Sequence, residues 1–168
     1  MANLILWRHA DAEILSVNGN DIDRALTKRG RKDAAKMAQW LHQYLPKNTV
    51  IYCSPARRCL ETAAALQKLN ADKIQREVKV AEFLSVDSTV EAMVKKLTDT
   101  DNSKTFLIIG HQPNLGLLIA KILGMQESAC VVKKGAVWWL RQRNVAGVSA
   151  VAAQTYLFAV QHPDYLPN

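Results

Sequence analysis

Two histidines and at least two arginines in this sequence occupy positions from which they could handle a phosphoryl group. Three polar clusters each follow a short apolar run: Arg8-His9-Ala10, Ser54-Pro55-Ala56-Arg57-Arg58 and Gly110-His111-Gln112-Pro113. A guanidinium group matches phosphate oxygens with paired hydrogen bonds, and a neutral imidazole can attack phosphorus. A second imidazole, if protonated, can donate to an oxygen that gains charge in the transition state. The clusters therefore predict phosphoryl-transfer chemistry.

The apolar pattern indicates how three distant clusters could meet. It predicts buried strands over residues 4–7, 50–53, 78–81, 105–109, 136–140 and about 150–160. Amphipathic helices are expected from an N-cap at Thr27 to Pro46, after Pro55, over about 89–97, and after Pro113. The segment from 11 to 26 lacks periodicity and holds a turn signal at 18–20. Parallel strands bring their carboxyl ends to one edge of a sheet, so the clusters should converge there.

The order of these elements predicts the fold class. Strands that alternate with helices and end in a strand pair predict an α/β three-layer sandwich with a mostly parallel central sheet. The last two strands would be joined by a loop containing Gly147, so one strand should run antiparallel. The 168 residues show no repeat or linker and suit a single domain over 1–168.

The composition limits the kinds of partner and the cell compartment that we expect for this protein. A net charge of +7 favours anionic partners without choosing among them. There is no run of five basic residues and no apolar segment of about 20 residues, so we expect neither nucleic acid nor a membrane as partner. The apolar run up to Trp7 is too short for a signal peptide. An odd set of three cysteines without metal-ligand spacing favours the reducing cytoplasm, with no metal and no cofactor.

The polar clusters resemble the motifs of the histidine phosphatase superfamily, which includes phosphoglycerate mutases and acid phosphatases. The short length and the opening Arg-His-Ala-Asp-Ala are most similar to the SixA-type phosphohistidine phosphatases. The resemblance implies a phosphoglycerate mutase-like fold. It rests on Arg8-His9-Ala10 for Arg-His-Gly, on Ser54, Pro55, Arg58 and Thr62 for Ser-Pro-x-x-Arg-x-x-x-Thr, on Gly110, His111 and Pro113 for Gly-His-x-Pro, and on Leu26, Thr27 and Gly30 for Leu-Thr-x-x-Gly.

The resemblance also implies roles for individual residues. His9 would be the nucleophile that carries the phosphoryl group as a phosphohistidine intermediate. Arg8 and Arg58 would clamp the phosphate, His111 would be the second imidazole, and Arg24 would be a further phosphate contact. Charge repulsion from Arg8 and Arg58 should in addition disfavour protonation of His9.

The general acid is less defined. Family members usually carry an acidic residue after the third strand, and Glu82 fits that place. Asp11, two residues after the nucleophile, is the alternative, and either could instead be a salt-bridged surface residue. Ala10 replaces the usual glycine, which would cost about 1 kcal/mol if a positive φ were required there.

The expected activity is hydrolysis of phosphohistidine on a protein substrate, with inorganic phosphate as product. The alternatives are a small-molecule phosphomonoester phosphatase or mutase of the same superfamily, and a non-catalytic phosphoprotein-binding module. Intact His9 and His111 favour catalysis. The loops are too short to hold an insertion that covers the site, which favours an open site and a protein substrate. Cys53 and Arg58 are one residue too close for a cysteine phosphatase, and His42 and His162 are interpreted as structural or exposed.

Overall fold

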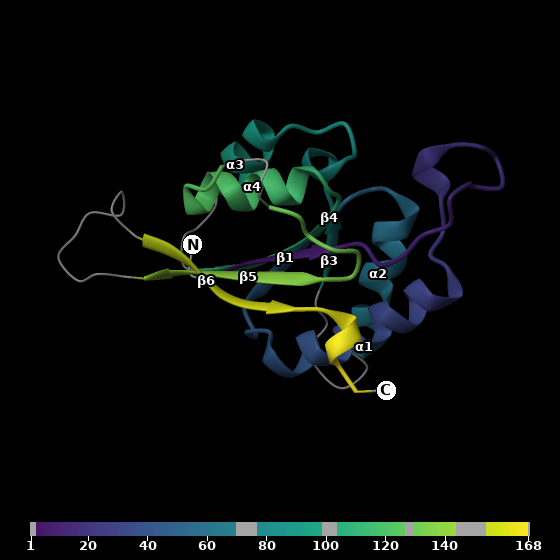
Figure 1. Ribbon diagram of the computed structural model, residues 1–168, viewed down its shortest axis with the longest axis horizontal. Helices are drawn as coiled ribbons and strands as arrows, with labels where there is room; N and C mark the ends of the chain where they lie inside the picture. The colour runs from purple at the N-terminus through teal and green to yellow at the C-terminus, as the bar shows by residue number, and fades with distance from the viewer. Residues whose placement is uncertain (1–2, 70–76, 99–103, 127–129, 144–153, 168) are drawn as a thin grey trace.

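A six-stranded sheet lies between two pairs of helices (Figure 1). The structure is a computed structural model that describes residues 3–69, 77–98, 104–126, 130–143 and 154–167. In chain order its elements are β1 (Asn3–Arg8), η1 (Asp21–Asp23), α1 (Lys28–Tyr44), β2 (Thr49–Cys53), α2 (Arg57–Gln67), β3 (Val78–Val80), η3 (Glu82–Leu84), α3 (Val90–Thr98), β4 (Thr105–Gly110), α4 (Asn114–Leu123), β5 (Val137–Arg143), β6 (Gln154–Gln161) and η6 (Pro163–Tyr165).

The strand order is β3-β2-β4-β1-β5-β6. β1 and β2 both pair with β4 in parallel, and β3 is parallel to β2. β5 is antiparallel to both of its neighbours, β1 and β6, so it is the one reversed strand of this sheet. The predicted α/β fold with a mostly parallel sheet and one antiparallel strand is confirmed.

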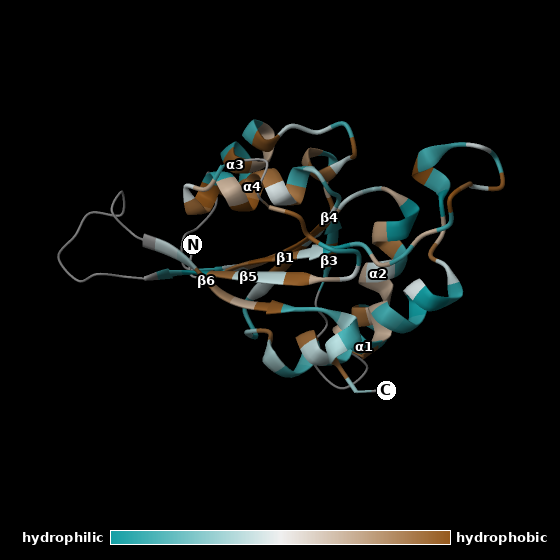
Figure 2. Cartoon of the chain, in the orientation of Figure 1, coloured by the Kyte–Doolittle hydropathy of each residue, from teal (hydrophilic) through white to brown (hydrophobic). Residues whose placement is uncertain are grey.

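The two faces of the sheet are covered by different helices (Figure 1). The face covered by α1 and α2 receives Ile5 and Trp7 of β1, and the face covered by α3 and α4 receives Leu4 and Leu6. Successive side chains of a strand point to opposite faces. A strand covered on both sides therefore carries a continuous apolar run, as residues 4–7 of β1 and 106–109 of the fully buried β4 do (Figure 2). This burial explains why the central strands were predictable from short apolar runs.

The helix after the first loop begins where predicted. The Thr27 side chain accepts a hydrogen bond of 2.9 Å from the backbone N–H of Gly30, which caps α1. The helix buries Ala34, Met37, Ala38 and Leu41 at spacings of three and four. Its amphipathic pattern thus fixes which face of the helix meets the sheet.

Thr27 and Gly30 also hold the chain that leaves β1. The backbone N–H of Thr27 donates to the carbonyl of Asp11 at 3.0 Å. A Cβ at Gly30 would overlap that same carbonyl oxygen, so only glycine permits this close approach. The Leu-Thr-x-x-Gly stretch therefore anchors the start of the segment from 11 to 26 against α1. The turn predicted within that segment is present, and Gly19 adopts a φ of +80° there.

Some details differ from the sequence predictions. The short 3-10 helices η1, η3 and η6 carry no periodic pattern and were not predicted. The loop with Gly147, and residues 150–153 of the predicted last strand, lie outside the described residues. In the part of the chain that the structure describes, no helix is long and apolar enough to cross a membrane.

Candidate active site

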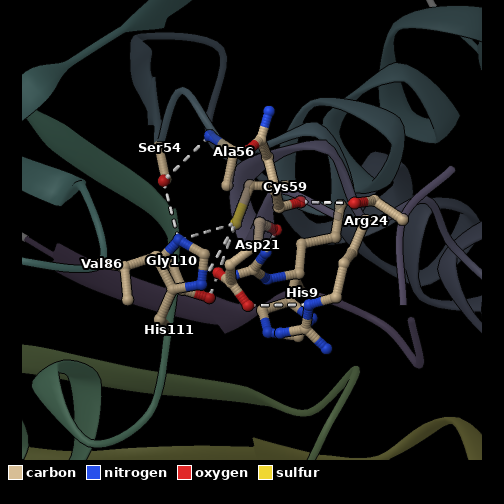
Figure 3. A network of polar contacts seen from close by, with 12 residues as sticks. His9, Asp21, Arg24, Ser54, Ala56, Cys59, Val86, Gly110 and His111 are labelled. Atoms are coloured by element: carbon tan, nitrogen blue, oxygen red, sulfur yellow. Dashed lines mark hydrogen bonds and ion pairs between the residues drawn. The ribbon is translucent and has the colours of Figure 1, made fainter. Parts of the chain in front are cut away.

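The three polar clusters meet at the carboxyl edge of the sheet, because β2, β4 and β1 are neighbours. The ring centroids of His9 and His111 lie 5.2 Å apart. Backbone bonds fix both loops: the N–H of His9 donates to the carbonyl of Gly110, and that of Ser54 donates to the carbonyl of Ile109. Figure 3 shows the resulting network around the two imidazoles. The predicted convergence of the clusters is confirmed.

His9 is held as a neutral imidazole with one free nitrogen. Its Nδ1 lies 2.8 Å from the carbonyl oxygen of Ala10. A carbonyl can only accept, so Nδ1 carries the hydrogen and Nε2 keeps its lone pair. The pKa of His9 is lowered to about 4, mainly by burial. The hydrogen bond to Ala10 acts in the opposite direction, and the positive charges of Arg58, Arg8 and Arg24 add to the lowering. This state suits a nucleophile at neutral pH.

His111 is also neutral in this structure. Burial is the main cause that lowers its pKa to about 3, with contributions from His9 and Arg58. Its Nε2 lies 2.7 Å from Oγ of Ser54, which itself accepts the N–H of Ala56. If the Ser54 hydroxyl donates to Nε2, the hydrogen of the ring lies on Nδ1. In that tautomer a neutral His111 keeps an N–H donor, without the positive charge considered from the sequence.

Arg8 and Arg58 present buried donors to the site. Nη1 of Arg8 donates to the carbonyl of Val132 at 2.8 Å, which fixes that side chain. Arg58 is only 2% exposed. The Nε atoms of both arginines are buried and have no hydrogen-bond partner among the described residues. Buried donors normally have partners, so this pair of N–H groups fits an anionic ligand.

Asp21 is a site residue that the sequence analysis missed. Arg58 donates through Nη1 to its backbone oxygen at 2.7 Å and through Nη2 to its carboxylate at 2.9 Å. Arg24 approaches the same carboxylate at 2.8 Å and also donates to the carbonyl of Glu13. Burial acts to raise the pKa of Asp21, but the hydrogen bond and charge of Arg58, with the charge of Arg24, outweigh it and lower the pKa. An aspartate in a segment without periodicity carries no pattern that would reveal this role.

The two candidate acids lie in different surroundings. Glu82 begins η3 directly after β3 and is exposed, and its carboxylate has no hydrogen bond or ion pair to a described residue. Asp11 pairs with Nζ of Lys134 at 2.7 Å and accepts from Oγ1 of Thr27 at 3.0 Å. The Lys134 hydrogen bond is the main cause that lowers the pKa of Asp11. Asp11 is thus kept ionised by its contacts with Lys134 and Thr27, which makes it a poor proton donor.

Thr62, the last residue of the Ser-Pro-x-x-Arg-x-x-x-Thr motif, has a structural role. Its Oγ1 accepts the backbone N–H of Ala10 at 3.2 Å and donates to the carbonyl of Arg58 at 2.7 Å. The threonine therefore ties the loop after β1 to α2. Its spacing of four from Arg58 places both on one face of that helix.

The cysteines behave as buried thiols. Cys59 lies beside the site, with Sγ 3.5 Å from Nε2 of His111. Burial raises the pKa of Cys59 to about 12 and also raises that of Cys53. Neither is a thiolate at neutral pH, in agreement with the rejection of a cysteine nucleophile. Among the described residues, no three His, Cys, Asp or Glu side chains are grouped as metal ligands would be.

The site is more enclosed than the short loops predict. His9 is 6% exposed and His111 is 4% exposed. The segment between β1 and α1 contributes to this enclosure, because it places Asp21 against Arg58. An opening remains beside His111 as a pocket of about 360 Å³ that includes Asp21 and Ser54 in its lining.

The structure is an α/β protein whose sheet edge brings together two imidazoles and two arginines. Comparisons agree with this class. The family model of the histidine phosphatase superfamily (branch 1) matches residues 4–84. A phosphohistidine phosphatase SixA homologue from Haemophilus influenzae is 26% identical over 132 residues, which cover 74% of this chain and 79% of the relative.

Solved structures show the same relationship along nearly the whole chain. A protein from Nakamurella multipartitia, provisionally named phosphohistidine phosphatase SixA, matches with a TM-score of 0.75, 26% identity and coverage of 96% of both chains. A protein from Escherichia coli, provisionally named alpha-ribazole-5'-P phosphatase, matches with a TM-score of 0.74, 17% identity and coverage of 97% of this chain and 98% of its own.

The chain is therefore similar to the histidine phosphatase superfamily, through the family model over residues 4–84 and through relatives along most of its length. This similarity supports a phosphatase, a hydrolase, as its class of activity.

Proposed function

We propose that this protein hydrolyses phosphohistidine on a protein substrate through a phosphohistidine intermediate on His9. The observation that carries the proposal is the state of His9. Its Nδ1 is engaged with the Ala10 carbonyl, its Nε2 is free, and its pKa is about 4. Two buried arginine N–H groups without partners and a second neutral imidazole surround it.

The first half-reaction would transfer the phosphoryl group to the enzyme. Its oxygens accept hydrogen bonds from Arg8 and Arg58, and Nε2 of His9 attacks the phosphorus. The P–N bond of the substrate breaks and its electron pair goes to the substrate nitrogen. His111 donates a hydrogen bond to an equatorial oxygen as charge builds there.

The second half-reaction would release the phosphate. A water molecule attacks the phosphorus of phosphorylated His9, and the P–N bond breaks with its electron pair returning to Nε2. Inorganic phosphate leaves with the water oxygen, and the proton of the water passes to phosphate or solvent. The enzyme returns to the neutral His9 of this structure.

A protein substrate is supported by exposed apolar residues on a segment that reaches the site. The segment that carries Asp21 and Arg24 also carries Ile14, Leu15 and Val17, whose exposed fractions are 87%, 78% and 107%. Highly exposed apolar side chains are a feature of surfaces that contact other proteins. The name of the Haemophilus influenzae relative supports phosphohistidine as the group removed. Cytoplasmic location stays a prediction.

A small-molecule phosphatase is the second candidate. The low exposure of both histidines and the pocket of about 360 Å³ would also suit a small phosphate ester. The Escherichia coli neighbour, named for a small phosphorylated metabolite, supports this alternative.

A side-by-side assay separates the two candidates. The purified protein is given a phosphohistidine-containing protein, a phosphoserine peptide and p-nitrophenyl phosphate, and kcat/KM is measured for each. We expect the phosphohistidine protein to have the highest kcat/KM. A higher value for a small phosphate ester than for the phosphohistidine protein would favour the second candidate.

A further inference from the structure

The pocket beside His111 has walls of a different chemistry from the phosphate clamp. Asp21 and Asp87 are its charged lining residues, and Ile22, Pro55 and Val86 supply apolar surface. No lysine or arginine is among the described residues that line it. A cavity of about 360 Å³ with these walls suits a small, partly apolar group that carries a positive charge or an N–H donor.

This pocket adjoins the site described above, because two of its lining residues bond residues of that site. Ser54 lines the pocket and bonds Nε2 of His111 at 2.7 Å. Asp21 lines it too and bonds Arg58 at 2.9 Å. In Figure 3, Ser54, Ala56, Asp21 and Val86 surround the His111 ring. A group in the pocket would therefore adjoin a phosphoryl group held between Arg58 and His111, which is the place of a leaving group.

We propose that this pocket receives the imidazole ring of the substrate phosphohistidine, and that Asp87 accepts a hydrogen bond from the ring nitrogen remote from phosphorus. The inference rests on the proposed function and adds a specificity-determining residue to it. A phosphorylated ring that is protonated on the remote nitrogen is a cation. When the P–N bond breaks, its electron pair stays on the ring nitrogen and the ring departs as neutral imidazole, with the remote hydrogen still in place.

A carboxylate beside the remote nitrogen promotes cleavage of the P–N bond. It favours the protonated ring, which is the form that departs as a neutral leaving group. The serine alkoxide that leaves a phosphoserine gains nothing from a second negative charge nearby. The acidic pocket therefore selects phosphohistidine against alkyl phosphate esters.

Asp87 is better suited to this role than Asp21. The carboxylate of Asp21 is engaged by Arg58 and Arg24, which compensate its charge. Asp87 follows η3, is exposed, and has no hydrogen bond or ion pair to a described residue. The charged groups at the pocket are the two aspartates, together with Arg58 and Arg24, which pair with Asp21. Asp87 is therefore the carboxylate at the pocket whose charge no described residue compensates.

The test compares the wild type with Asp87→Asn on a phosphohistidine peptide and on p-nitrophenyl phosphate, at pH 6 and pH 8. At pH 8 we expect kcat/KM for phosphohistidine to fall about tenfold, the size of one lost charge-assisted hydrogen bond. At pH 6 the loss should be smaller, because an imidazole with a pKa near 6.5 is then largely protonated without help. The ratio of kcat/KM for phosphohistidine over p-nitrophenyl phosphate should fall with it. Glu91→Gln is the control for net charge, since Glu91 pairs with Lys121 outside the pocket.

Three outcomes would overturn the inference. If the wild type hydrolyses phosphohistidine and Asp87→Asn keeps the wild-type kcat/KM on both substrates at both pH values, the pocket assignment is wrong while the proposed function stands. An equal loss on both substrates would mean that Asp87 acts on the phosphoryl group and not on the ring. A wild type that turns over p-nitrophenyl phosphate but not phosphohistidine would remove the proposed function and this inference together.

Discussion

Oγ of Ser54 lies 2.7 Å from Nε2 of His111, and both groups are buried. The serine oxygen accepts the N–H of Ala56, and the serine hydroxyl can itself donate to Nε2. With that donation, the serine of the Ser-Pro motif holds His111, 57 residues later in the chain, in the Nδ1–H tautomer. Ser54 is a positioning residue that would act on the phosphoryl group through His111.

Ser54→Ala should lower kcat about fivefold, because a neutral hydrogen bond contributes about 1 kcal/mol and Nε2 of His111 would lose its donor. The ¹⁵N NMR shifts of His111 should change from one tautomer to a mixture. Ser88→Ala is the control, since Ser88 makes a bond of equal length, 2.7 Å, to the carbonyl of Phe83. Unchanged His111 shifts in Ser54→Ala would contradict the positioning role.

His9→Ala should abolish both turnover and the phosphoenzyme. If His9 is the nucleophile, brief exposure to substrate should trap acid-labile, alkali-stable phosphate on the wild type and none on the variant. His42→Ala is the matched control, because His42 is exposed on α1. Substantial turnover by His9→Ala would exclude this mechanism.

Arg58→Ala should lower turnover by about a hundredfold or more, because it removes a preorganised charge aimed at the transferring phosphoryl group. Inhibition by vanadate or inorganic phosphate should weaken in parallel. Arg57→Ala controls for the loss of one arginine on α2, since Arg57 is exposed and pairs with Glu61. A variant at position 58 with unchanged rate and inhibition would show that Arg58 does not bind the phosphate.

The parts of the site that were predictable are those carried by periodic elements. His9, Ser54 and His111 each follow a buried strand, and strand ends can be read from short apolar runs. The rule that parallel strands end at one edge then brings them together. Arg58 was singled out from its neighbour Arg57 by the resemblance to the Ser-Pro-x-x-Arg motif.

Other parts were not predictable because they depend on the path of irregular backbone. Asp21 reaches Arg58 only because the segment before α1 folds back over the site. Asp87 enters the pocket through the short turn after η3. Local propensity says little about such segments, and their ion pairs form across the tertiary structure. The same segment helps to explain why the site is more enclosed than the loop lengths suggest.

The acid limb of the pH profile should lie well below that of an ordinary histidine. The pKa of His9 is lowered from 6.5 to about 4, so its Nε2 stays unprotonated and reactive down to about pH 4. NMR titration of the ring C–H signals should show His9 neutral at pH 5. A midpoint near 6.5 would contradict the burial and charge repulsion described here.

The lowered pKa values of His9 and His111 also make the stability of the fold depend on pH. Between about pH 6.5 and pH 4 the unfolded chain binds protons at positions 9 and 111 that the folded chain does not. The free energy of unfolding should therefore fall as the pH is lowered through that range. Urea unfolding at pH 7 and pH 5 should show a smaller fall in His9→Ala than in the wild type. An equal fall in both proteins would contradict the lowered pKa of His9.

The final prediction separates Glu82 from Asp11 as acids. An alkyl phosphate ester leaves as a basic alkoxide unless it is protonated, whereas phosphohistidine departs as neutral imidazole. If Glu82 is the acid, Glu82→Gln should lower kcat/KM for a phosphoserine peptide about a hundredfold and for phosphohistidine less than tenfold. Asp11→Asn should change neither by much, because Asp11 is kept ionised by Lys134. It should instead cost less than about 1 kcal/mol of stability, as a partly exposed pair does.

The measurement is kcat/KM on both substrates for the wild type and the two variants, with urea unfolding as the stability readout. An equal loss on both substrates in Glu82→Gln would show that Glu82 acts on something other than the leaving group. A large loss on the ester in Asp11→Asn would transfer the acid role to Asp11, and its contact with Lys134 would then have to open during turnover. A wild type that prefers phosphoserine would remove the substrate assignment and leave the chemistry of His9 intact.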